Sequence, residues 1–315
     1  MASSSLEPIR RIALIGFGEA GGIFGGDFAA KKLEVSAFDI LFHSKQQRDA
    51  MLQKARERKV RASESLQDCV RDADLVISAV TASSARDAAR EAAPHLRREQ
   101  MFLDINSVSP ETKRQVAAQI SPTAFFVEAA VMAAVPPQRL KVPMLLGGPY
   151  AGVAAERLRA LGMNATALSD RIGVASAVKM CRSVFIKGLE ALAVESLIAA
   201  RRYGAENEVL ASLAATYPSM GWGESLPDYL VSRVAEHGRR RAAELREVAQ
   251  ALREVGVEPK LASATAERQD WLVDEMAERE IEYEKDKTFS WRALADAISA
   301  PAETAGKSGG KKTTR

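Results

Sequence analysis

One stretch near the amino terminus constrains the fold more than any other part of the chain. A short apolar segment, Ile12 to Ile15, leads directly into a glycine-rich turn over residues 16–21. A run that can be helical follows, and a second apolar segment, Val35 to Phe38, ends at Asp39. Strand, glycine turn, helix and strand is the order of a βαβ unit, so the chain is predicted to open a parallel sheet.

The glycines of this turn follow the pattern G-x-G-x-x-G. Gly16 would permit the tight turn, Gly18 would let a diphosphate approach the backbone, and Gly21 would let the helix pack closely on the strand. Asp39 lies 18 residues after the third glycine, where a carboxylate can accept hydrogen bonds from both hydroxyls of an adenosine ribose. The pattern therefore predicts a dinucleotide site at the helix N-terminus.

The predicted coenzyme is NAD rather than NADP, because the Asp39 carboxylate would repel a 2′-phosphate. Lys45 and Arg48 lie just beyond it and could soften this preference, or they could simply form a solvated helix face. The predicted coenzyme-binding residues are Gly16, Phe17, Gly18, Glu19, Ala20, Gly21, Asp39, Val80, Thr81 and Asn106.

Length and composition exclude several classes of protein. With 315 residues and 47% hydrophobic residues, two domains are expected, and a net charge of +3 argues against a general nucleic-acid binder. No apolar run approaches the roughly 20 residues that cross a membrane. Cys69 and Cys181, with no signal peptide, indicate a reduced cytoplasmic setting, and the three histidines lack the spacing of a metal site.

Further apolar segments alternate with helical patterns along the first half of the chain. Predicted strands lie at 61–62, 75–80, 101–105, 125–131 and 142–146. This alternation favours a doubly wound, mostly parallel α/β sheet. Ligands of such a sheet bind where the strands end, so the glycine turn, Asp39, Thr81, Ser107 and the loop after Val131 are expected at one edge.

The pattern changes near Ala175, where a long helix is predicted to run to Arg202, and the rest of the chain is predicted to be helical. The expected organisation is a leader (1–10), an NAD-binding Rossmann domain (11–172), an all-helical substrate and dimerisation domain (173–298) and a disordered basic tail (299–315). Lys179 lies early in this helix. It is either a surface residue with a buried stem or a functional amine whose pKa burial lowers.

Four motifs in order resemble the β-hydroxyacid dehydrogenases, which include 3-hydroxyisobutyrate and 6-phosphogluconate dehydrogenases. The glycine turn is the first. Residues 104–110 are similar to the family's D-x-S-T-x-S-P loop, and residues 128–134 to its D-A-P-V-S-G-G segment. Gly173, Lys179, Arg182 and Ser183 resemble its catalytic helix. The C-terminal part looks like a divergent phosphogluconate-dehydrogenase-like branch, which implies a Rossmann domain followed by a helical domain.

The resemblance implies roles for individual residues. Lys179 would be the general acid/base for the alcohol being oxidised. Ser107 would hold substrate or the nicotinamide ribose, although a helix N-cap is an equally good interpretation. The implied substrate-binding residues are Ser107, Met132, Ala133, Ala134, Arg182 and Ser183.

The chain departs from the family at two of these motifs. Met132-Ala133-Ala134 replaces the Ser-Gly-Gly that receives a substrate carboxylate, and Arg182 with Ser183 replaces paired asparagines. Arg182 lies one helical turn from Lys179, so we interpret it as carboxylate recognition moved to the helix. Alternatively, Arg182 pairs with a structural acid such as Glu128.

Charged residues further on have open interpretations. Lys187 could line the cleft or pair with an acid of the helical domain, and His237 with Arg240 and Arg241 could form a substrate clamp from a partner subunit or a solvated helix face.

The sequence as a whole indicates an NAD-dependent oxidoreductase acting on the hydroxyl group of a small anionic β-hydroxy acid. The alternatives are an imine or keto reductase of the same fold and a non-catalytic NAD-binding sensor. The resemblance also implies a homodimer formed through the helical domain. No nucleic acid, membrane or metal is expected to take part.

Overall fold

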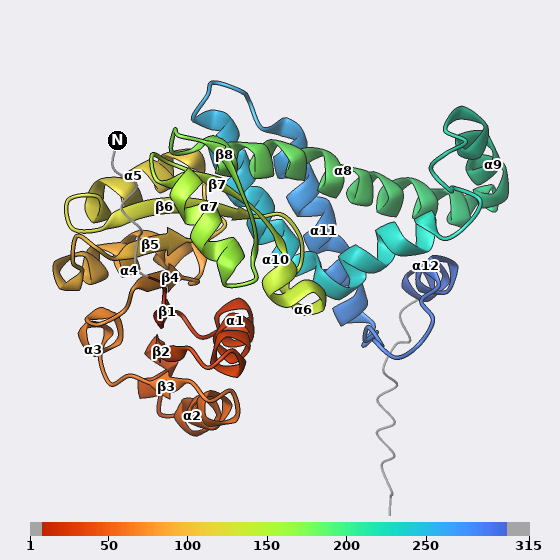
Figure 1. The fold of residues 1–315 in the computed structure, drawn as a ribbon. Coiled ribbons are helices and arrows are strands. Elements are labelled where there is room, and N and C mark those ends of the chain that lie inside the picture. Colours follow the sequence, from red (N-terminus) through yellow and green to blue (C-terminus); the bar gives the residue numbers. More distant parts are fainter. Residues whose placement is uncertain (1–7, 301–315) are drawn as a thin grey trace, which may run out of the picture. The chain divides into compact units, whose positions relative to one another are not determined.

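The computed structural model describes residues 8–300, which form two compact units (Figure 1). The first, which we call the sheet unit, contains residues 8–184 and 247–259, and the second, the helical unit, contains residues 185–246 and 260–300. The expected leader (1–10) lies mostly outside the described residues, and so does the expected basic tail (299–315).

A mixed sheet forms the centre of the sheet unit. Among the described residues its strands run in the order β3-β2-β1-β4-β5-β6-β7-β8. Their bounds are Arg11–Ile15 (β1), Glu34–Phe38 (β2), Arg61–Ala62 (β3), Leu75–Ser78 (β4), Met101–Asp104 (β5), Phe125–Val131 (β6), Pro143–Gly147 (β7) and Asn164–Ser169 (β8). Neighbouring strands pair in parallel except β6 and β7, which are antiparallel.

Helices cover both faces of this sheet. They are α1 (Glu19–Ala30), α2 (Arg48–Glu57), α3 (Leu66–Val70), α4 (Ala85–Ala92), α5 (Pro110–Ile120), α6 (Val135–Gln138) and α7 (Ala151–Ala160). Ile12 and Leu14 face a core shared with α1, α2 and α7, whereas Ala13 and Ile15 face a second core shared with α3, α4 and α5. Strand side chains alternate between faces, so β1 is apolar on both faces from Ile12 to Ile15. The predicted doubly wound α/β fold is confirmed.

The strand register aligns the strand ends that matter for function. Ile15, the last residue of β1, pairs with Phe38 of β2 and Ser78 of β4. Ser78 pairs with Asp104 of β5, and Asp104 with Glu128 of β6. The loops after β1, β2, β4 and β5 therefore start at one level of the sheet, which we call the carboxyl edge, and β6 continues past this level to Val131.

Strand β8 was not predicted from the sequence. Its residues are mostly small or polar, and only Ala165 among them is fully buried. It pairs in parallel with β7. A strand at the end of a sheet can keep one face in water, so it lacks the apolar run that marks central strands.

The helical unit is built around long helices. They are α8 (Val174–Tyr203), α9 (Glu206–Thr216), α10 (Leu226–Arg253), α11 (Lys260–Glu278) and α12 (Trp291–Ser299). Its core includes Val194, Leu197, Trp222, Leu272 and Trp291. No helix among the described residues combines the length and the apolar character that a bilayer crossing requires.

The two units do not divide the chain at the expected position between residues 172 and 173. The first turns of α8, up to Val184, group with the sheet, and so does the segment Glu247–Pro259 at the end of α10. Lys179, Arg182 and Ser183 consequently belong to the sheet unit.

Candidate functional site

The glycine turn at the end of β1 is shaped by its neighbours. Gly16 has φ +93° and its N–H donates to Phe38 O at 2.8 Å. A Cβ at Gly16 would overlap Ala79 O, and one at Gly21 would overlap Gly16 O. A Cβ at Gly18 would meet nothing within 4 Å. Packing thus requires the first and third glycines, whereas the second leaves open space in front of the backbone.

Helix α1 begins directly after this open space. Its first hydrogen bond runs from Gly22 N to Gly18 O at 3.1 Å, and the N–H groups before Gly22 have no acceptor within the helix. Such a helix N-terminus favours a phosphate by its N–H groups and its dipole. The turn therefore fits the diphosphate of a dinucleotide.

Asp39 connects the end of β2 to the glycine turn. Its carboxylate accepts hydrogen bonds from Phe17 N at 2.7 Å and from Leu41 N at 2.9 Å. Each carboxylate oxygen has a second lone pair, so both can also accept a ribose hydroxyl. Asp39 is thus both a support of the turn and a suitable ribose acceptor.

Two basic residues, Lys54 of α2 and Arg58 directly after it, also hold the turn, and the sequence analysis did not identify them. Lys54 Nζ donates to Phe17 O at 2.7 Å and to Gly18 O at 2.8 Å, and Arg58 donates to Gly22 O at 2.8 Å. Burial lowers the pKa of Lys54, Arg58 lowers it further, and Asp39 opposes both effects. Their spacing of one helical turn is visible in the sequence, but it does not indicate what the two cations contact.

Asn106 holds the loop after β4. Its side chain is buried, with Nδ2 donating to Ser78 Oγ at 2.9 Å and Oδ1 accepting from Val80 N at 2.7 Å. Thr81 is exposed beside it and contacts the hydroxyl of Ser84 at 2.9 Å. The Asn106 amide therefore supports the turn at Val80 and Thr81, two of the predicted coenzyme-binding residues.

The loop after β5 leads into α5, whose first turn is bonded to a residue distant in sequence, Glu254. Ser109, not Ser107, is the N-cap of α5, and it accepts from Thr112 N. Its hydroxyl donates to Glu254 at 2.5 Å, and Glu254 also accepts from Glu111 N at 3.1 Å. Ser107 is half-buried in this loop. The structure thus assigns the capping role to the neighbouring serine, which removes the alternative interpretation of Ser107.

Glu128 joins the sheet to α8. This fully buried carboxylate accepts from Gly173 N at 2.9 Å, Ala175 N at 3.0 Å and Ser176 Oγ at 3.0 Å. A carboxylate at a helix N-terminus satisfies free N–H groups and complements the helix dipole. Glu128 therefore fixes the first turn of α8 at the carboxyl edge.

The predicted catalytic lysine and two of the predicted substrate-binding residues follow this anchored turn. Lys179 is half-buried in the second turn of α8, Arg182 is exposed one turn further on, and Ser183 is half-buried. The pairing of Arg182 with Glu128 is not the arrangement found, because Glu128 accepts from the start of α8.

The loop after β6 differs from a carboxylate-binding turn. Met132 N donates to Pro143 O at 2.9 Å, as a continuation of the sheet, and Ala133 and Ala134 are exposed. The Met132 N–H is therefore engaged within the protein.

The charged residues of the helical unit pair within that unit. Lys187 Nζ donates to Glu244 at 2.7 Å, and buried Arg241 makes two hydrogen bonds to Glu190. Burial lowers the pKa of Lys187 and raises that of Glu190. Arg241 is thus buried and bonded to Glu190 within its own unit, which differs from the solvated helix face that was one of its two interpretations.

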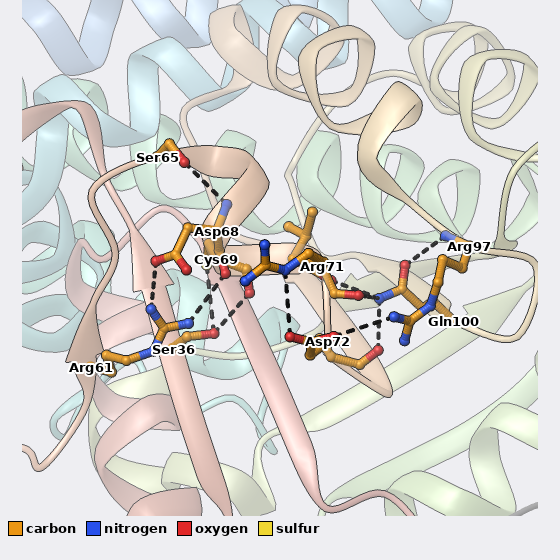
Figure 2. A network of polar contacts seen from close by, with 11 residues as sticks. Ser36, Arg61, Ser65, Asp68, Cys69, Arg71, Asp72, Arg97 and Gln100 are labelled. Carbon is orange, nitrogen blue, oxygen red and sulfur yellow. Dashed lines mark hydrogen bonds and ion pairs between the residues drawn. The ribbon is translucent and has the colours of Figure 1, made fainter.

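At the opposite edge of the sheet, where the strands begin, polar groups of the protein pair with one another (Figure 2). Gln100 Nε2 donates to Val70 O at 2.6 Å and to Ala73 O at 2.7 Å, and Arg61 pairs with Asp68 at 2.5 Å. A hollow of about 450 Å³ lies at this edge, lined in part by this ion pair. Its charges neutralise each other, whereas the carboxyl edge presents free N–H groups.

Residues 8–300 contain no cluster of three metal-binding side chains.

Comparison with known proteins agrees with this geometry. Residues 11–149 match the NAD binding domain of 6-phosphogluconate dehydrogenase, and residues 200–272 match a domain of unknown function, DUF1932. An uncharacterized 28.5 kDa protein from Methanothermus fervidus is 30% identical over 76% of this chain and 89% of its own length.

Solved structures share the fold over most of the chain. A conserved hypothetical protein from Sinorhizobium meliloti is 36% identical, with a TM-score of 0.77, over 95% of this chain and 98% of its own. A conserved protein described as structurally similar to 3-hydroxyacid dehydrogenases is 31% identical, with a TM-score of 0.69, over 84% of this chain and 97% of its own. Two further structures share the fold at lower identity. The 3-hydroxyisobutyrate dehydrogenase of Mycobacterium tuberculosis is 16% identical, with a TM-score of 0.70, over 93% of this chain and 100% of its own. An imine reductase of Streptomyces aurantiacus is 14% identical, with a TM-score of 0.54, over 92% of this chain and 100% of its own.

The fold and the glycine turn define an NAD(P)-binding protein of the Rossmann class. Within that class, the chain belongs to the β-hydroxyacid dehydrogenase family, in a divergent branch related to 6-phosphogluconate dehydrogenase.

Proposed function

We propose that this protein is an NAD-dependent dehydrogenase that oxidises the hydroxyl group of a β-hydroxy acid, either a sugar acid or a branched acid similar to 3-hydroxyisobutyrate. The observation that supports this most is the anchoring of α8 by Glu128, which fixes Lys179 on the sheet unit, the unit that also carries the glycine turn.

The residues that would hold the coenzyme are those of the carboxyl edge. The glycine turn and the first turn of α1 would bind the diphosphate, and Asp39 would bind the adenosine ribose. When bound, NAD accepts the hydride from the substrate carbon. Asp39 carries a negative charge where NADP has its 2′-phosphate, which supports the preference for NAD.

Lys179 would take the hydroxyl proton of the substrate as hydride leaves the same carbon. A neutral amine is needed for this step, since a protonated lysine cannot accept the hydroxyl proton. Arg182 would bind the substrate carboxylate, because its guanidinium donates two parallel hydrogen bonds. This role suits a chain whose Met132 N–H is already engaged with Pro143.

An imine or keto reductase is the second candidate. The loop of Met132, Ala133 and Ala134 lacks the serine hydroxyl and the two glycines that receive a carboxylate in related dehydrogenases. An apolar imine or ketone would not need them. The presence of Lys179 favours the dehydrogenase.

A screen of substrates tests both proposals. Purified protein is incubated with a panel of 3-hydroxy acids and aldonic acids plus NAD or NADP, and in the reverse direction with cyclic imines and keto acids plus NADH or NADPH, while coenzyme absorbance is followed. Reduction of NAD by a hydroxy acid is the expected result. Turnover of imines alone would favour the reductase, and coenzyme binding without any turnover would favour a sensor.

A further inference from the structure

The ammonium group of Lys54 lies against the glycine turn although Lys54 comes from a different helix. It donates to two consecutive carbonyl groups, Phe17 O at 2.7 Å and Gly18 O at 2.8 Å, and lies 5.2 Å from the centre of the Phe17 ring. Lys54 is 36 residues from Gly18 in sequence. Such a contact needs a cationic donor with a long stem, since it reaches from α2 to the start of α1.

Peptide geometry gives these two hydrogen bonds a consequence on the other side of the chain. A trans peptide is planar, and its C=O and N–H groups point in opposite directions. The peptide that contains Phe17 O also contains Gly18 N–H, and the peptide that contains Gly18 O also contains Glu19 N–H. With both carbonyls held by Lys54, both N–H groups point away from α2.

Helix α1 contains a glycine that makes room for Lys54. A Cβ at Gly22 would lie 2.8 Å from Lys54 Cε and 3.1 Å from its Nζ. Glycine in the middle of a helix is unfavourable, so its presence here needs a reason. The position of the Lys54 side chain supplies one.

We propose that Lys54 is a positioning residue that orients the peptides of residues 17–19, so that Gly18 N–H and Glu19 N–H face the coenzyme diphosphate. Asp39 holds the preceding peptide through Phe17 N, and the two charged side chains together fix three successive peptides. This inference rests on the coenzyme site of the proposed function but not on the reaction assigned to Lys179.

Binding measurements on three ligands test this role. Calorimetry measures the affinity for NADH and ADP, which carry a diphosphate, and ligand-observed NMR measures the affinity for adenosine, which does not. The comparison separates the contribution of the diphosphate to binding from that of the nucleoside. Lys54→Met is expected to lower the affinity for NADH and ADP about tenfold to a hundredfold and to leave the affinity for adenosine unchanged. The loss would follow because the charge-assisted hydrogen bonds that order the site are removed. Lys54→Arg should recover most of the loss, and Lys141→Met, an exposed lysine of the same unit, should change nothing.

Gly22→Ala provides a second variant that keeps the lysine. The three atoms nearest to the added methyl group belong to the flexible end of Lys54 and the outer part of Arg58, and alanine favours the helix. Because the ammonium is displaced, the affinity for NADH and ADP should again fall and the affinity for adenosine should stay unchanged. Unchanged affinity for all three ligands in Lys54→Met, or an equal loss for adenosine, would overturn the proposal. Failure of every substrate screen would leave these binding results untouched.

Discussion

At the scale of single residues, the Asp39 carboxylate links the shape of the glycine turn to the choice of coenzyme. It accepts from Phe17 N in the glycine turn and from Leu41 N in the turn that follows β2. Its position therefore depends on the same backbone that would bind the diphosphate. A change at Asp39 should alter both the shape of the turn and the discrimination between NAD and NADP.

We expect Asp39→Asn to lower the affinity for NADH about tenfold, because the amide accepts fewer and weaker hydrogen bonds than the carboxylate. Affinity for NADPH should fall less or rise, since the repulsion of the 2′-phosphate is removed. Fluorescence titration of both reduced coenzymes measures this. Asp49→Asn, at an exposed position of α2, is the matched control. A variant that still prefers NADH as strongly as the unmodified protein would contradict the role of Asp39.

The residues found from sequence and those missed differ in one physical respect. Gly16, Gly18, Gly21 and Asp39 lie within one βαβ unit, where local spacing determines what each can contact. Lys54 contacts the same turn only after α2 has packed against α1, and nothing in a charged helix indicates which of its cations will do so.

At the scale of elements, the connection between β6 and α8 positions the predicted chemistry. Both elements were predicted within a few residues of their bounds, Phe125–Val131 and Val174–Tyr203. Their junction was not, because Glu128 contacts Gly173 across 45 residues of sequence. Gly147 on β7 pairs with Glu128 in the sheet and leaves room for its carboxylate.

Gly147→Ala tests this junction. The new Cβ would overlap Glu128 Oε1, and Glu128 would have to move away from the N-terminus of α8. We expect a loss of about 1–3 kcal/mol in the free energy of unfolding, as for other overpacked cores, and a lower turnover with unchanged NADH affinity. Denaturant unfolding and NADH titration measure the two effects.

Gly152→Ala is the control, since a Cβ there meets nothing within 4 Å and alanine favours helix α7. Equal stability of the Gly147 and Gly152 variants would show that Glu128 is not held as described.

At the scale of the whole molecule, the order of elements was predictable but the grouping of the units was not. Alternating strands and helices predicted a doubly wound sheet followed by helices, and that is the fold. The return of residues 247–259 to the sheet unit depends on contacts such as that between Ser109 and Glu254, which are 145 residues apart. Pairings over such distances leave no periodic signal.

We also propose that the chain forms a homodimer through the helical unit, as the resemblance to the family implies. Phe185 and Leu192, two turns apart on α8, have exposed fractions of 73% and 67%. Large apolar side chains exposed together on one helix face favour an interface. Phe185→Glu with Leu192→Glu should yield a monomer in light scattering, whereas Leu261→Glu on α11 should not. A dimer that survives the double substitution would place the interface elsewhere.

The most direct test of the account is the turnover of Lys179→Met with the best hydroxy acid from the screen, measured beside its affinity for NADH. Loss of the proton-transferring amine should lower turnover about 10²- to 10⁴-fold and leave NADH affinity unchanged, while Lys141→Met should match the unmodified protein in both. Turnover close to that of the unmodified protein in Lys179→Met would contradict the assignment of the proton transfer to this residue.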